Sequence, residues 1–105
     1  MRDKIISYIG FAIKAGKIKM GVNAILSHRG DIHLLIMCNT ASKNTVKEAV
    51  KIAQKCGTDI IVCKGDTLEN ILNKENCKLA AILDSSLANA IKDNLNDKFV
   101  QFGGK

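Results

Sequence analysis

The most constraining feature of the sequence is a nearly continuous apolar run at residues 34–37, inside a longer apolar segment at 32–38. A strand that is covered on both faces needs apolar side chains at successive positions, whereas a strand with one wet face alternates apolar and polar residues. Two further short apolar runs, at Ile60–Cys63 and 79–83, have the same character. The sequence therefore predicts a central sheet with helices on both faces.

Helix-like segments alternate with these strands. Apolar side chains recur near helical spacing in Lys4–Ala15 and Lys43–Cys56, which end at Gly16 and Gly57, and Ser42 can cap the second helix. Shorter elements are expected as a strand at 17–20 and as helices at 22–28, 67–72 and 85–95, the last one capped by Ser85. This order favours the α/β class, as a single-domain three-layer α/β/α sandwich with a mixed central sheet of about four strands.

Chain length and composition fit one folded domain. The 105 residues suit a compact domain with a modest core, and a hydrophobic fraction of 47% argues against disorder. Without proline, repeats or low-complexity tracts, nothing divides the chain, so residues 1–105 are expected to form a single domain. The tail at 96–105 ends in Gly-Gly-Lys and is expected to be loose.

The charge balance favours an anionic partner. The formal net charge is +6, although a solvated lysine surface would produce the same count. Aromatic residues are only 4% and tryptophan is absent, so a base-stacking platform has little material. There is no signal-like amino terminus and no apolar run of membrane-spanning length, so we expect a soluble, cytoplasmic protein with no membrane partner.

The cysteines do not form a metal-binding pattern. No C-x-x-C pair occurs, and the two histidines are not spaced to complete a zinc finger, so neither a metal nor a cofactor is expected. Cys38 and Cys63 lie in apolar runs, where a free thiol usually behaves as a small buried hydrophobe. Unpaired thiols are consistent with a reducing compartment.

Two short polar stretches, at 20–27 and 73–78, lie where a strand-like run meets a helix-like run, and lysines flank both. Amide and ammonium groups beside a glycine turn suit phosphates and base edges. If the fold brings the stretches together, they form a nucleic-acid-binding surface. The candidate RNA-binding residues are Lys17, Lys19, Gly21, Asn23, Lys74, Glu75, Asn76 and Lys78. The alternative is an ordinary helix-start turn beside solvated lysines.

Other polar features have simpler explanations. A lysine stripe at four-residue spacing follows one side of Lys43–Cys56, and it is either a solvated face or an auxiliary RNA contact. Asn39, Asp66 and Asp84 fall at strand ends, where ligands bind in open α/β sheets, but capping and turn formation account for all three.

The motifs also resemble a known family. Residues 9–17, Ile-Gly-Phe-Ala-Ile-Lys-Ala-Gly-Lys, followed by Gly21, resemble the opening of the bacterial YlxQ-type ribosomal-protein family. Residues 68–76, then Ala80-Ala81-Ile82 with Asp84, then Leu87-Ala88 with Ile91, resemble its carboxy-terminal half. This family is similar to archaeal and eukaryotic ribosomal proteins that bind kink-turn RNA. The resemblance implies a three-layer sandwich and an RNA-binding role associated with the ribosome.

The kink-turn binders carry Gly-x-Asn-Glu-x-x-Lys after the first strand, and Gly21 and Asn23 match this pattern. A second motif of these proteins, Leu-Gly-x-x-Ile-Gly-Lys, corresponds to the region that begins at Leu68, and the match there is through Lys74, Glu75 and Asn76. Ala24 and Ser27 depart from the first pattern, and Glu69 and Asn73 replace the two glycines of the second. The first two replace the side chains that would read tandem G·A pairs, which leaves open whether a kink-turn is required.

No catalytic motif stands out. A phosphate-cradling glycine loop and H-E-x-x-H are absent, and Ser85, His33 and Asp84 form a triad only if residues are chosen freely. The sequence therefore predicts a non-catalytic protein that binds structured RNA, ribosomal or in another RNA particle, with no small-molecule substrate. Two alternatives remain: a protein-interaction module on the same scaffold, and the substrate-recognition half of a split RNA-modifying enzyme.

Overall fold

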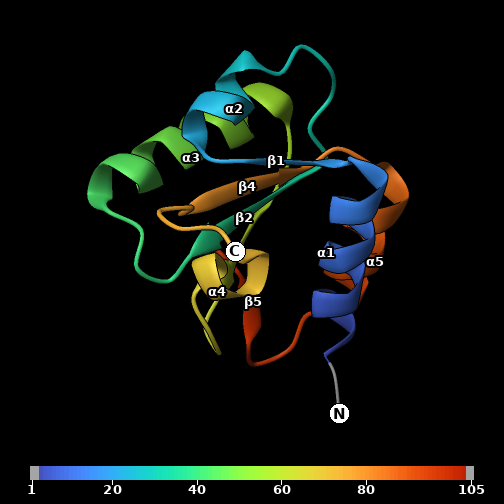
Figure 1. Cartoon of the computed structure of the whole chain (residues 1–105). Coiled ribbons are helices and arrows are strands. Elements are labelled where there is room, and N and C mark those ends of the chain that lie inside the picture. Colours follow the sequence, from blue (N-terminus) through green and yellow to red (C-terminus); the bar gives the residue numbers. More distant parts are fainter. Residues whose placement is uncertain (1–2, 104–105) are drawn as a thin grey trace.

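The computed structural model describes residues 3–103, which form a five-stranded mixed sheet between two helix layers (Figure 1). The elements are α1 (Lys4–Ala15), β1 (Ile18–Met20), α2 (Val22–Ser27), β2 (Leu34–Cys38), α3 (Lys43–Cys56), β3 (Ile60–Cys63), α4 (Leu68–Leu72), β4 (Leu79–Ile82), α5 (Ser85–Asp93) and β5 (Phe99–Gln101). The predicted α/β sandwich is confirmed.

The strands lie in the order β1-β4-β2-β3-β5. β2 and β3 are parallel, and the other neighbouring pairs are antiparallel. All five residues of β2 are buried, as the continuous apolar run predicts. Successive side chains of a strand point to opposite faces, so Leu34 and Ile36 join one core cluster while Leu35 and Met37 join another.

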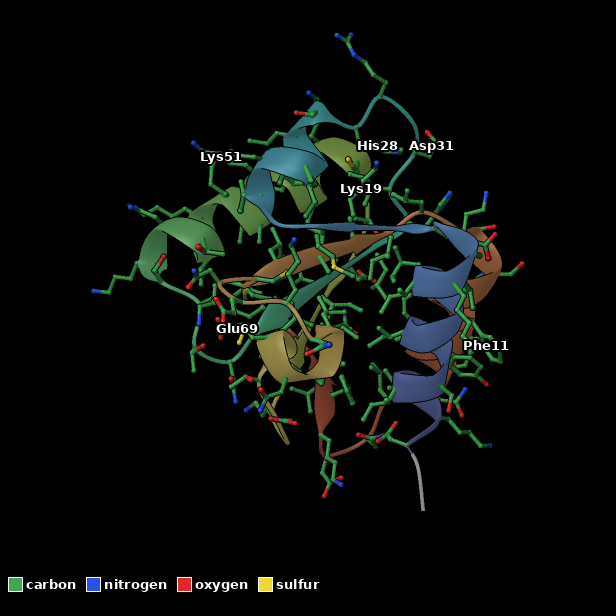
Figure 2. The ribbon with its side chains drawn as sticks, in the orientation of Figure 1. Phe11, Lys19, His28, Asp31, Lys51 and Glu69 are labelled. Atoms are coloured by element: carbon green, nitrogen blue, oxygen red, sulfur yellow. The ribbon has the colours of Figure 1, made fainter. Side chains whose placement is uncertain are left out.

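Two core clusters define the two helix layers. The buried residues of α1, α4 and α5 pack on one face of the sheet, and those of α2 and α3 pack on the other. In α1, Ile5, Ile9 and Ala12 face the core. Phe11 points outward from this helix and is 59% exposed (Figure 2). None of the helices within residues 3–103 is long and apolar enough to cross a membrane.

The ends of α3 match the prediction, whereas the ends of α5 do not. The Ser42 hydroxyl accepts the Thr45 N–H, and Gly57 ends α3 in the left-handed conformation with φ 65°, both as predicted. At α5, the cap is Asp84 and not Ser85, because the Asp84 carboxylate accepts the Leu87 N–H at 2.9 Å. The helix begins one residue after this cap, at Ser85, and ends at Asp93, two residues before the predicted end at residue 95.

The prediction of a loose tail at 96–105 is wrong for Phe99–Gln101. These residues form β5, which pairs antiparallel with β3. Phe99 is only 1% exposed and belongs to the core cluster under α1, α4 and α5. Pairing covers the free edge of β3, and burial of one aromatic ring stabilises the short strand. The sheet therefore has one strand more than expected, while Gly104 and Lys105 lie outside the described residues.

Candidate nucleic-acid interface

Strand directions bring the two predicted polar stretches to one end of the sheet. β1 and β2 run in the same direction and β4 runs opposite to them, so the segment after β1 lies beside the segment before β4. The Gly21 N–H donates to the Leu79 carbonyl at 2.7 Å. The Cys38 N–H donates to the Lys78 carbonyl at 2.8 Å, so the loop after β2 lies at the same end of the sheet. The proximity that the sequence hypothesis requires is therefore present.

A shallow pocket of about 380 Å³ lies between these segments. Its lining includes Gly21, Asn23, Ala24, Thr45, Asn76 and Lys78. The side chains of Asn23 and Asn76 are exposed, so both amides can reach a ligand. Thr45, in the first turn of α3, is a lining residue that the sequence analysis missed, since nothing in the local pattern shows that α3 begins beside α2.

The backbone at this pocket uses conformations that few residues adopt. Gly21 has φ 94° and ψ 150°, a region that is essentially restricted to glycine. Asn73 and Asn76 are left-handed, with φ 54° and 58°, and asparagine tolerates this region better than most residues. Asn73 therefore adopts, without a glycine, a left-handed backbone conformation that glycine would adopt easily.

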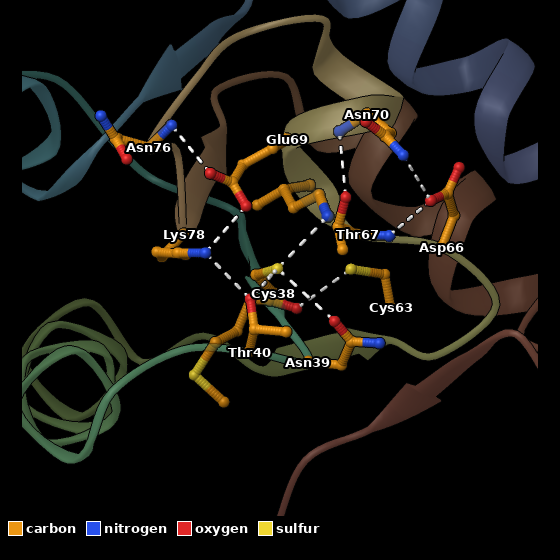
Figure 3. A network of polar contacts seen from close by, with 12 residues as sticks. Cys38, Asn39, Thr40, Cys63, Asp66, Thr67, Glu69, Asn70, Asn76 and Lys78 are labelled. Carbon is orange, nitrogen blue, oxygen red and sulfur yellow. Dashed lines mark hydrogen bonds and ion pairs between the residues drawn. The ribbon is translucent and has the colours of Figure 1, made fainter.

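An ion pair fixes the loop at 73–78 (Figure 3). The Lys78 ammonium donates to Glu69 Oε1 at 2.8 Å and to Thr40 Oγ1 at 2.9 Å. The second carboxylate oxygen of Glu69 accepts the Asn76 N–H at 2.8 Å. Glu69 thus ties α4 to the loop and orients Asn76. Lys78 is engaged within the protein, so its main role here is to position the loop.

The same contact shifts both pKa values. The hydrogen bond from Lys78 lowers the pKa of the Glu69 carboxyl, and Glu69 raises the pKa of the Lys78 ammonium. A lowered carboxyl pKa stabilises the folded loop above the ordinary glutamate value of 4.5, and this contribution is lost as the pH falls through the folded pKa. At high pH it is lost as the pH rises through the raised lysine pKa.

We therefore expect the Asn76 amide to report on the ionisation of Glu69. Acidification below pH 4.5 should move the Asn76 N–H resonance and speed its hydrogen exchange, because the charged acceptor disappears. In Glu69→Gln the acidic transition of this resonance should be absent, as measured by NMR titration. The same transition in Glu69→Gln would mean that another group controls the loop.

The remaining candidate residues, Lys17, Lys19, Lys74 and Glu75, do not line the pocket. Lys19 is exposed on the edge strand β1, opposite Ala81 of β4. Lys74 and Glu75 are exposed and line a separate shallow pocket beside α4. Lys17 is not brought to the pocket: its carbonyl accepts the Leu83 N–H at the other end of β1, and four residues of strand span about 13 Å.

The two thiols predicted to be buried lie at the same end of the sheet, in the last residues of β2 and β3. Cys38 and Cys63 are register partners in β2 and β3 and are at most 1% exposed, which confirms the prediction. Burial raises the pKa of the Cys63 thiol to about 11. Burial also opposes ionisation of Cys38, but the hydrogen bonds that the thiol makes with Thr40 and accepts from the Leu68 N–H, together with the charge of Lys78, outweigh it, so the pKa of Cys38 is lowered.

The residues of the possible triad and the polar residues at strand ends do not form a second site. His33 and Ser85 line a pocket of about 310 Å³ at the opposite end of the sheet, but the Asp84 carboxylate is bound to the Leu87 N–H. Asp66 accepts the Thr67 N–H at 2.7 Å, so turn formation and capping account for Asp66 and Asp84. Within residues 3–103, no group of three or more His, Cys, Asp and Glu side chains could hold a metal ion.

Comparison with known proteins adds no family assignment. No family model matches the chain, and no curated protein matches it. The function proposed below rests on the residues and the geometry of the pocket between Gly21 and Asn76.

Proposed function

We propose that the protein is a non-catalytic, cytoplasmic RNA-binding protein that recognises structured RNA, in the ribosome or in another RNA particle. The observation that carries this proposal is the junction of two distant segments at one exposed pocket. Gly21 and Leu79 are hydrogen-bonded at 2.7 Å, and Asn23 and Asn76 line the pocket between them. The likeness of both segments to motifs of the YlxQ-type family supports the same function.

The chemistry of the pocket suits exposed base edges. A side-chain amide offers two donors and an acceptor, which match the edges of bases. Such edges are accessible at loops, bulges and bends, because the deep groove of a regular RNA helix is closed to side chains. Ala24 and Ser27 replace the two charged residues of the kink-turn motif. The proposed ligand is therefore an irregular RNA helix, of which a kink-turn is one form.

Charge around the pocket supports the same ligand. Lys19 and Lys74 are exposed, and each lies close in the chain to a residue that lines the pocket: Lys19 directly precedes Met20, and Lys74 lies two residues before Asn76. The whole chain has a net charge of +6. Lysines that neutralise phosphates release counterions, so binding should weaken steeply as salt is added. Lys17, in contrast, is too far along β1 to take part in the same contact.

Asn23→Ala tests base-edge recognition. We expect this variant to lose about tenfold of its preference for an RNA with an asymmetric internal loop over a plain duplex, because the amide contacts only the irregular element. Filter binding or fluorescence anisotropy with both RNAs measures the ratio. Asn89→Ala, the same truncation at an exposed position of α5 beside the pocket at the opposite end of the sheet, is the control and should leave the ratio unchanged. An equal loss on both RNAs would show that Asn23 only supports the fold.

A protein-interaction module is the second candidate, and exposed apolar side chains favour it. Phe11 and Leu26 are both 59% exposed, on α1 and α2 respectively. The two helices lie on opposite faces of the sheet, so the two side chains do not form one patch, and each would make a separate contact with a partner. Size-exclusion chromatography of a cell extract, before and after complete ribonuclease digestion, separates the two functions. A complex that survives digestion supports a protein partner, and one that disappears supports RNA.

A further inference from the structure

α3 carries a stripe of lysines on the side that faces away from the sheet. Ala49, Ile52 and Ala53 are the buried residues of this helix. The lysine stripe consists of Lys43, Lys47, Lys51 and Lys55, and all four are exposed. Each four-residue step turns about 40° around the helix axis, so the stripe drifts gradually along the outer surface. Figure 2 shows Lys51 on the outer side of α3, in the same layer as α2.

The lysine stripe has no carboxylate partners among residues 3–103. The two ion pairs found in this part of the chain are Lys78–Glu69 and Lys92–Asp59. Three successive pairs of the stripe have i,i+4 spacing, at which like charges repel each other. Lys43 also lies in the first turn of α3, where the helix dipole disfavours a cation. Glu48, three residues before Lys51, offsets part of this repulsion, and the last turn of the helix favours the charge of Lys55. The repulsion that remains is greatest between Lys43 and Lys47, and an external polyanion would relieve it.

The lysine stripe begins at the end of α3 that borders the candidate interface. Thr45, two residues after Lys43, lines the same pocket as Asn23, and Lys43 projects from the other side of the same helical turn. α2 and α3 lie in the same layer, on the face of the sheet opposite α1 (Figure 1). From Lys43 to Lys55 the helix advances about 18 Å along its axis. A ligand at the pocket that continues as an extended polyanion can therefore follow α3.

We propose that the lysine stripe binds the phosphate backbone of a double-helical RNA stem that adjoins the irregular element held at the pocket. This proposal rests on the proposed function and adds the kind of RNA: a helical irregularity with a continuing stem. Lysine ammonium groups on flexible stems act as point charges, so these contacts add affinity and fix orientation without reading sequence. Interfacial membrane helices present an apolar side to the lipid, whereas the apolar side of α3 is already buried in the core.

Single charge reversals test the proposal, and we choose Lys47→Glu and Lys51→Glu. Each replaces two repulsive i,i+4 pairs by two attractive ones, but Lys51→Glu also places a second carboxylate three residues after Glu48. Lys47→Glu should therefore unfold about 2–5 °C higher than wild type, and Lys51→Glu should gain less. Each should nevertheless bind RNA roughly threefold to tenfold more weakly, with the slope of log Kobs against log salt reduced by about one. A gain in stability with a loss of affinity separates a binding role from a structural one.

The probe is an RNA hairpin with one asymmetric internal loop flanked by two stems. Two further hairpins each have one of these stems cut to its closing pair, so that a comparison of the two identifies the stem that follows α3. Lys4→Glu is the control, because this exposed lysine lies on α1, on the other face of the sheet, and undergoes the same charge change. We expect wild-type affinity from the control. On the RNA that lacks the relevant stem, the stripe variants should bind as wild type does.

The outcomes separate this proposal from the proposed function. If the wild-type protein binds neither hairpin, the proposed function is overturned, and this proposal with it. If wild type binds but the stripe variants match Lys4→Glu in affinity and salt slope, only the stripe proposal is overturned. An equal loss on the long-stem and short-stem RNAs also overturns it. Stripe-dependent capture of wild type by anionic phospholipid vesicles, without such dependence for RNA, assigns the stripe to a membrane and overturns it too.

Discussion

Phe99→Ala is expected to lower the free energy of unfolding by about 3–5 kcal/mol. Phe99 is 1% exposed and is the largest of the fully buried side chains in the described part of the chain. Its ring packs in the cluster that contains Ile61 and Leu68, and its strand pairs with β3. Truncation removes buried apolar surface and leaves a cavity. Urea unfolding followed by circular dichroism measures the change.

Phe11→Ala is the matched control for this prediction. Phe11 is 59% exposed on α1, so the same truncation should cost less than about 1 kcal/mol. If Phe99→Ala prevents folding, Phe99→Leu retains most of the volume and should still cost about 1 kcal/mol. Equal effects of Phe99→Ala and Phe11→Ala would mean that β5 does not contribute to the core.

Reversing two charges beside the pocket, in Lys19→Glu/Lys74→Glu, should weaken RNA binding by about tenfold to a hundredfold. Both lysines are exposed, and they lie one and two residues before Met20 and Asn76, which line the pocket. Each lost phosphate contact also lowers the slope of log Kobs against log salt by about 0.7–0.9, so the double variant should lose between one and two units. Binding to the internal-loop hairpin across a salt series measures both quantities.

Lys4→Glu/Lys14→Glu has the same change in net charge, and both of its positions are exposed on α1. This control separates a local contact from the general effect of charge. The α1 variant should keep the salt slope of wild type. If the single and double variants at Lys19 and Lys74 retain full affinity, or if the α1 variant loses as much, the surface around the pocket is not the RNA-binding surface.

Much of the fold was predictable because burial leaves a local periodic pattern. The run at 34–37 predicted a strand covered on both faces, and all of β2 is buried. The helical spacing, Ser42 and Gly57 predicted α3 with its observed bounds. Turn chemistry also pointed to the polar stretches beside Gly21 and Asn76, since glycine and asparagine favour the backbone angles found there.

Other features depended on contacts between distant segments. β5 is too short to be recognised by pattern, and it exists because β3 offers a free edge and the core accepts Phe99. The role of Lys78 followed from its contact with Glu69, nine residues away. Lys17 and Lys19 looked equivalent in sequence, yet strand geometry places Lys17 at the far end of β1.

The order of apolar and polar residues along this chain was enough to determine a layered α/β domain, because each helix or strand records in its own spacing which side it buries. Which strand edges meet, which charges neutralise each other and which lysines stay free for a ligand were decided only by the tertiary structure. Those properties depend on distances between residues that local spacing does not encode.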